Sequence, residues 1–297
     1  MNPVEFLRFF VNNSLFTFFI IFISFILGWV LYNYVILRTM ALKESLFEKD
    51  NPAAWAEFIG AFIFPTLYLA ARAVEGSASE NIFLDLMICL GYAFMYILLL
   101  TALRVVSAHV IGVMSPTDAN GRIDLNSEIY AQKNVSASLF SITLSVVFVS
   151  MLSFLDMEPG LVVPSLLRIL NVLIFTILAF TAYSAMLRRK TSLLTEVFVH
   201  NNVAAGASFL GFATAVELIL ANAISLQKTF NYPILLAVCA ISLIILGIFS
   251  AVFRILFSRI ISVDIWNEIY NQNNVGAALG QAAVYISIAF VITGFMK

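Results

Sequence analysis

The chain has 297 residues, of which 62% are hydrophobic and only 11% are charged, and its formal net charge is −1. Soluble globular proteins have about 25% charged residues, so the composition excludes that class and predicts an all-α polytopic membrane protein. The balance of 16 Lys and Arg against 17 Asp and Glu excludes a basic nucleic-acid-binding surface, and two cysteines exclude a disulfide scaffold.

Eight stretches of the chain are long and apolar enough to cross a bilayer as helices. A hydrocarbon core about 30 Å thick requires about 20 such residues per helix. The lipid bilayer is therefore the first predicted partner. In chain order, the predicted spans are residues 14–37, 53–75, 82–106, 135–155, 161–187, 203–226, 231–257 and 275–296.

The basic residues predict the orientation of these spans. Most Lys and Arg residues follow the first, third, fifth and seventh spans, and few lie in the other connections. Short loops rich in Lys and Arg stay in the cytoplasm. The pattern predicts an inner-membrane protein with both termini on the outer, periplasmic side.

Four similar segments precede the even-numbered spans. Three of them share the pattern Glu, aliphatic, aromatic, two variable residues, polar, Asn, Val and then small residues, and the first is a weaker copy that has lost the Glu and has Pro52 for Val. We call them motif 1 (45–51), motif 2 (128–134), motif 3 (196–202) and motif 4 (268–274). Such self-similarity predicts four parallel helix–motif–helix repeats. Two repeats form each half of the chain, residues 1–157 and 158–297.

The doubled asparagines Asn201-Asn202 and Asn273-Asn274, each followed by Val and small residues, resemble the YjfL-like family of bacterial inner-membrane proteins, domain of unknown function 350. Members of that family usually have two helix–motif–helix repeats, so the resemblance implies two such units in tandem. The first half departs from the pattern, because Lys133 replaces the first Asn and Pro52 replaces Val. The family has no established activity, so the resemblance implies a topology and no function.

The asparagines allow two interpretations. Asn is a preferred N-cap, because its side-chain oxygen accepts a hydrogen bond from a free N–H group of the first helical turn. Alternatively, four helix N-termini, each with a partial positive charge, converge into a vestibule that attracts anions, and the carboxamides contact a solute. The candidates are Asn51, Asn134, Asn201, Asn202, Asn273 and Asn274.

Three carboxylates recur six residues before the last Asn of their motifs: Glu128, Glu196 and Glu268. The favoured interpretation is a solvated anchor on a short interfacial helix, whose aliphatic–aromatic pair lies among the lipid headgroups. A cation site is the alternative, but it would need more carboxylates close together.

Three ionisable residues are expected within the membrane, where such residues usually have a partner or face water. Arg168 and Glu217 lie at similar predicted depths on two helices of one repeat, so we expect an ion pair that either joins the helices or acts as a gate. Glu57 has no equally deep basic partner, so we expect it to be protonated or to face water.

The sequence contains no common catalytic or metal-binding signature, so we expect no enzyme, cofactor or metal site. Two classes of function remain. The first is a channel or transporter for a small ion or solute, built around the motif helices. The second is a non-transporting subunit or scaffold that docks a cytoplasmic protein; a homo-oligomer fits either class. A water-filled cavity lined by Glu57, Glu217 or the asparagines favours transport, and a packed centre favours the scaffold.

Overall fold

The computed structural model describes residues 3–38, 42–75, 81–114, 123–155, 161–187, 192–225 and 232–296. These parts of the chain contain eight helical spans that are long and apolar enough to cross a membrane. The protein is therefore an all-α, multi-pass membrane protein, as its composition predicts. The spans are Ser14–Leu37, Pro52–Val74, Ile82–Met114, Val135–Leu152, Val162–Leu187, Val203–Ser225, Tyr232–Ile260 and Val275–Phe295.

The helices fall into three groups by their place relative to the motifs. The outer helices precede the motifs: α1 (Pro3–Leu31) with its π-helical continuation η1 (Tyr32–Leu37), α4 (Ile82–Met114), α6 (Val162–Leu187) and α8 (Tyr232–Ile261). The motifs form short helical turns: η2 (Glu44–Glu48), η4 (Ser127–Ala131), η5 (Thr195–Val199) and α9 (Ile265–Tyr270). The motif helices follow: α2 (Pro52–Trp55), η3 (Ala56–Ile63) and α3 (Phe64–Val74) as one span, then α5 (Val135–Leu152), α7 (Val203–Ser225) and α10 (Val275–Phe295).

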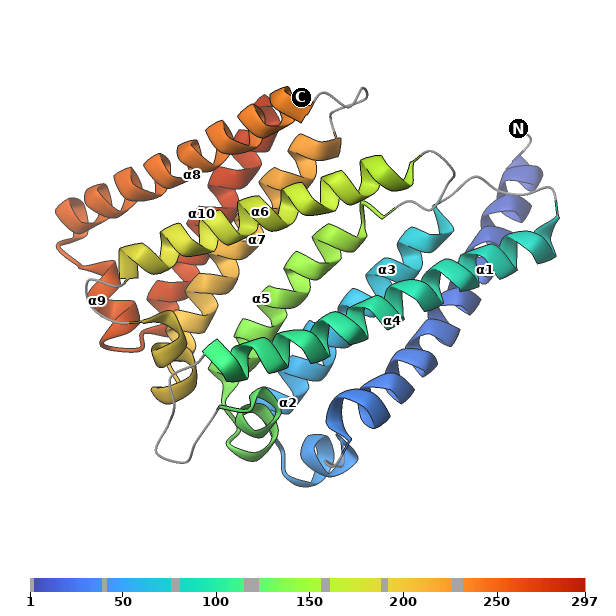
Figure 1. Ribbon diagram of the computed structural model, residues 1–297, viewed down its shortest axis with the longest axis horizontal. Helices are drawn as coiled ribbons and strands as arrows, with labels where there is room; N and C mark the ends of the chain where they lie inside the picture. The colour runs from blue at the N-terminus through green and yellow to red at the C-terminus, as the bar shows by residue number, and fades with distance from the viewer. Residues whose placement is uncertain are drawn as a thin grey trace.

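The motif helices stand side by side in chain order (Figure 1). α5 packs between η3 and α7, and α7 packs between α5 and α10. The alternative in which four helix N-termini converge into a vestibule is therefore wrong for the described helices. α5 and α7 each contact two neighbours through opposite faces, and such contacts extend a row instead of closing a ring.

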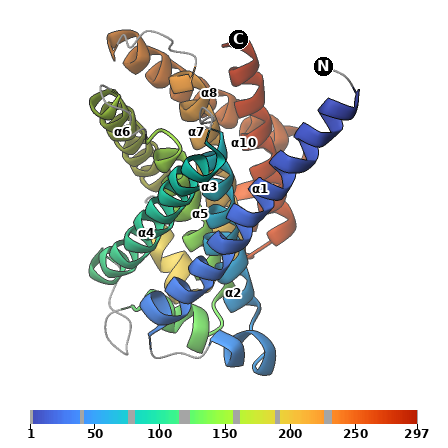
Figure 2. The ribbon, with the colours of Figure 1, turned by 90° about the vertical axis from the view of Figure 1, so that its right-hand side faces the viewer.

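The outer helices α4, α6 and α8 lie on one side of this row (Figures 1 and 2). Each fits between two successive motif helices: α4 contacts α3 and α5, α6 contacts α5 and α7, and α8 contacts α7 and α10. α1 packs on α3 and α4 at the first end of the row. The start of α1 and the end of α10 lie at the edge opposite the motif turns, so the two ends of the chain share one side (Figure 1).

The third span is longer than the predicted 82–106, because α4 has 33 residues and ends at Met114. At 1.5 Å per residue it is about 50 Å long, so it must cross a bilayer steeply tilted or extend beyond it. Arg104, close to the predicted end of this span, is a buried residue in the middle of its second half. The helix continues past this charge because the charge is paired within the protein. The predicted boundary between residues 157 and 158 lies outside the described parts of the chain.

Candidate functional site

In each motif the last asparagine caps the following helix. The side-chain oxygens of Asn51, Asn134, Asn202 and Asn274 accept hydrogen bonds from amides two or three residues further on, at 2.9–3.2 Å. The N-cap interpretation is therefore confirmed. A ligand role for these side chains stays a prediction.

The residue before each capping Asn has a left-handed backbone. These residues are Asp50, Lys133, Asn201 and Asn273, with φ between 45° and 56°. Asn adopts this conformation more easily than most residues, because its side chain can form local hydrogen bonds. The first Asn of each doubled pair is thus explained by backbone geometry. Asn273 also joins two helices, because its Oδ1 accepts a hydrogen bond of 2.9 Å from the amide of Ala204 in α7.

The motif carboxylates hold the capping asparagines in place. Nδ2 of Asn134 and of Asn202 donates to Oε2 of Glu128 and Glu196, respectively, each at 3.0 Å. Asn274 donates to Glu268 at 2.8 Å in the same way. Glu128 and Glu196 are buried, so the solvated-anchor interpretation is wrong for both.

The aliphatic–aromatic pairs of motifs 2, 3 and 4 are also buried, which contradicts their expected place among the lipid headgroups. These pairs are Ile129-Tyr130, Val197-Phe198 and Ile269-Tyr270. They belong to the packed core because each of these turns packs on the motif helix of the preceding repeat: η4 on α2, η5 on α5 and α9 on α7. The sequence pattern describes the apolar face of the turn but not the element that covers it.

The first three capping asparagines also bind the next motif along the chain. Nδ2 of Asn51 donates to the carbonyl of Ile129 at 2.9 Å. Asn134 donates to Val197, and Asn202 to Ile269, both at 3.0 Å. Four motifs are thus joined in series by three carboxamides.

The two ends of this series differ. At the first end, the carbonyl of Leu46 in motif 1 accepts a hydrogen bond of 3.1 Å from Nε1 of Trp55. At the other end, Asn274 is exposed and bonds within its own repeat, to Glu268 and to the amide of Ala277. At motif 1 the acceptor carbonyl is therefore bonded to the Trp55 indole, whereas at motif 4 the capping asparagine binds no further motif among the described residues.

We expect Asn202→Ala to cost about 3 kcal/mol of unfolding free energy. The change removes an N-cap, worth about 1 kcal/mol, and also removes the hydrogen bonds that Asn202 donates to Oε2 of buried Glu196 and to the carbonyl of Ile269. Asn274→Ala is the matched control and should cost only about 1 kcal/mol, because the same groups there reach solvent. Unfolding of both variants in one detergent measures the difference, and equal losses would contradict the buried series.

Glu57 has a basic partner, contrary to the expectation from the sequence. Nε of Arg104 donates to Oε1 of Glu57 at 2.7 Å, and both side chains are buried. Nη2 of Arg104 reaches Oδ1 of Asn126 at 3.1 Å, and Asn126 donates to the carbonyl of Ile36 at 3.0 Å. This group joins the first two repeats.

The predicted Arg168–Glu217 pair is wrong. Glu217 accepts a hydrogen bond of 2.6 Å from Oγ1 of Thr176 in α6. Thr176 lies eight residues beyond Arg168 on that helix, which is about 12 Å further along its axis. Arg168 instead lines a hollow of about 290 Å³ together with Arg72. The depth of each residue is predicted from the number of residues that separate it from the helix end, and this count takes no account of helix tilt.

Buried tyrosines form a feature that the sequence interpretation missed. Tyr32 of η1 bonds to Tyr130 of motif 2, and Tyr183 of α6 bonds to Tyr270 of motif 4 at 2.6 Å. Burial raises the pKa of Tyr130 and of Tyr270, so both phenols stay neutral. A signal existed: Tyr32 and Tyr183 each stand 19 residues before the capping Asn of their own repeat.

The second tyrosine pair continues into a chain of polar side chains. Tyr183 also bonds to Ser208 of α7 at 3.1 Å, and Ser208 donates to Gln281 of α10 at 2.9 Å. Nε2 of Gln281 donates to the hydroxyl of Tyr285 at 2.8 Å. These hydrogen bonds fix α6, α7 and α10 relative to one another inside the membrane.

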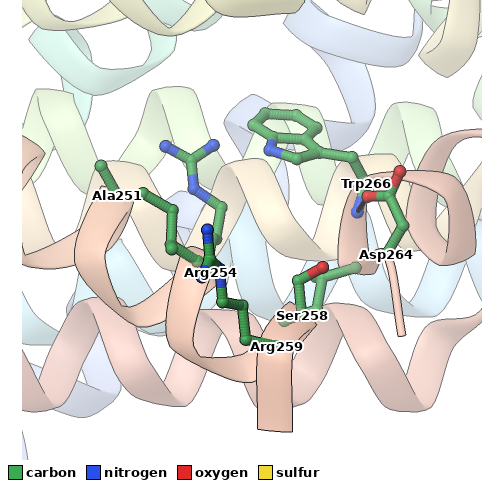
Figure 3. A pocket seen from close by; sticks show the side chains of 8 residues that line it. Ala251, Arg254, Ser258, Arg259, Asp264 and Trp266 are labelled. Atoms are coloured by element: carbon green, nitrogen blue, oxygen red, sulfur yellow. Dashed lines mark hydrogen bonds between the residues drawn. The ribbon is translucent and has the colours of Figure 1, made fainter. Parts of the chain in front are cut away.

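An open hollow of about 530 Å³ lies beside motif 4, between the end of α8 and α9. Figure 3 shows the Arg254 guanidinium facing the Trp266 ring, with Ser258, Arg259 and Asp264 around the hollow. The guanidinium carbon lies 4.9 Å from the ring centroid. Such a cation held on an aromatic face can bind an anionic group.

One protein-family model matches the second half of the chain. Residues 158–296 match the model described as Domain of Unknown Function (DUF350). The second half of this chain is therefore similar to DUF350 domains. Motifs 3 and 4, the Tyr183–Tyr270 pair and the hollow beside Trp266 all lie within the matched residues, and the resemblance seen at the doubled asparagines is confirmed. The tandem arrangement stays a prediction. No curated protein and no solved structure matched the chain.

Proposed function

We propose that this protein is a non-transporting membrane subunit that assembles with a partner inside the bilayer. The observation that carries the proposal is the use of the motif carboxamides within the chain. In Asn134 and Asn202, Oδ1 caps a helix and Nδ2 binds both a carboxylate and the next motif. A carboxamide engaged in this way has little capacity left to coordinate a passing solute.

The proposal includes an orientation. The excess of Lys and Arg after odd-numbered spans supports an inner-membrane location with the motifs on the cytoplasmic side and both termini outside. We also propose that the protein is not an enzyme, since its sequence lacks the common catalytic motifs. An assembly role requires no such site.

Transport of a small ion is the second candidate, and one observation favours it. Glu217 is a buried carboxylate with no ion pair to any side chain in the described parts of the molecule. A carboxylate at membrane depth is costly and often belongs to an ion or proton pathway. Its bond to Thr176 and its packing between α6 and α7 support a structural role instead.

Purified protein in liposomes tests the two candidates. We expect fluxes of K⁺, Na⁺, H⁺ and Cl⁻ equal to those of protein-free liposomes, for the wild type and for Glu217→Gln alike. Flux above that of the protein-free liposomes for any of these ions would overturn the proposal. A loss of such flux in Glu217→Gln would assign it to the buried carboxylate.

A further inference from the structure

The outward face of α10 is the open end of the motif row. We infer that this face binds the same face of a second copy of the chain, with α10 against α10 about a two-fold axis. The inference rests on the proposed function and names its partner. It is argued from a face of small residues that α7 buries against the next motif helix and that α10 repeats in exposed form.

Successive motif helices meet through corresponding positions. A Cβ atom at Gly60, nine residues after the Asn of motif 1, would lie 2.8 Å from Ile142, eight residues after the Asn of motif 2. Gly211, nine residues after the Asn of motif 3, lies against Ala282, eight residues after the Asn of motif 4. The same register therefore occurs at the first and the third contacts of the row.

We call the side of a motif helix that meets the next one its forward face. It comprises the positions 2, 6, 9 and 13 residues after the capping Asn. In α7 these residues are Ala204, Ser208, Gly211 and Ala215, and all four are buried, mostly against α10. In α10 the equivalent residues are Gly276, Gly280, Ala283 and Ser287, and all four are exposed.

The residues on the forward face of α10 are thus as small as those of α7 but are exposed, and in the described protein only Ser287 borders α8, across a hollow of about 460 Å³. A Cβ atom at Gly280 would meet nothing within 4 Å, whereas one at Gly211 would collide with Ala282. Small residues spaced by three or four let two membrane helices approach closely, and the gain in contacts drives their association. If this face were covered by lipid, α10 would lack the close helix–helix contacts that small residues allow.

A second copy could in principle bind with its motif 1 end, but that end is closed. The motif 1 carbonyl of Leu46, which corresponds to the acceptors in motifs 2 to 4, is bonded to Trp55. The aromatic rings of Trp29 and Tyr32 cover Phe58 and Phe62 on the same side. Head-to-tail pairing would also extend into an open filament, whereas pairing of identical faces closes as a dimer.

The association is tested with Gly280→Leu, and Gly91→Leu is the matched control. Both glycines are exposed, and a Cβ atom at either meets nothing within 4 Å, so both variants should fold. Subunit counting in nanodiscs or in dilute liposomes should give dimers for the wild type and for Gly91→Leu. Gly280→Leu should be monomeric, with the dimer dissociation constant raised at least tenfold.

A second measurement does not depend on disrupting the interface. Gly280→Cys and Ser287→Cys should form disulfide-linked dimers at one or both positions on mild oxidation in the membrane. Gly91→Cys should remain monomeric. The native Cys89 and Cys239 are buried, so the wild type supplies the background.

Two results would overturn the inference: a wild type that stays monomeric at every protein-to-lipid ratio, which would mean that lipid covers α10, or equal dimer content in Gly280→Leu and Gly91→Leu. A monomer that shows no ion flux would contradict the dimer and leave the proposed function standing. A dimer that conducts ions would contradict the proposed function and leave the α10 interface standing.

Discussion

Arg104→Met is expected to cost about 3–5 kcal/mol of unfolding free energy, because it leaves Glu57 as an uncompensated charge in the protein interior. The two side chains are joined at 2.7 Å and are 3% and 0% exposed, so water cannot replace the lost partner. Unfolding in detergent, followed by circular dichroism, measures the loss. The same change at Arg72, which pairs with Glu75 at the surface, is the control and should cost less than about 1 kcal/mol.

The double variant Glu57→Met/Arg104→Met should recover most of this stability. Oε2 of Glu57 and Nη1 of Arg104 have no hydrogen-bond partner in the part of the chain that the structure describes. An incompletely bonded buried pair can often be replaced by apolar residues at little cost. Additive losses in the double variant would show that the two residues do not act as a pair.

Gly211→Leu should cost about 3 kcal/mol and disrupt the packing of α7 on α10. Any side chain at this position meets the backbone and side chain of Ala282, so the two helices must move apart. Overpacking of a close contact typically costs 1–3 kcal/mol, and a contact between two backbones stands at the upper end of that range. Thermal unfolding of the purified variant provides the measurement.

Gly280→Leu tests the same substitution where no neighbour is present. Unfolding of the detergent-solubilised monomer should change by no more than about 0.5 kcal/mol, as for exposed positions in general. Comparable losses at Gly211 and Gly280 would show that the row of helices is not packed as described. Dimer formation of the Gly280 variant is measured separately in a bilayer, so it does not affect this comparison of unfolding free energies in detergent.

The sequence by itself determined the features that depend on neighbouring residues. Apolar runs of about 20 residues predict membrane helices because the bilayer sets that length, and the eight described spans all begin within one residue of the predicted positions. The capping asparagines were predictable for the same reason, since an N-cap bonds to amides two or three residues away. The DUF350 resemblance also followed from contiguous residues, Asn201-Asn202 and Asn273-Asn274.

Tertiary structure decided the partners of the buried polar groups. Glu57 and Arg104 are 47 residues apart, and Asn202 binds a carbonyl 67 residues away. The sequence gives depth only by counting from helix ends, and tilt makes that count unreliable, as the separate surroundings of Arg168 and Glu217 show. Periodicity likewise identifies small residues on α7 and α10 but not the helix that meets them. Only the packed structure distinguishes a row with one open face from a ring around a pore.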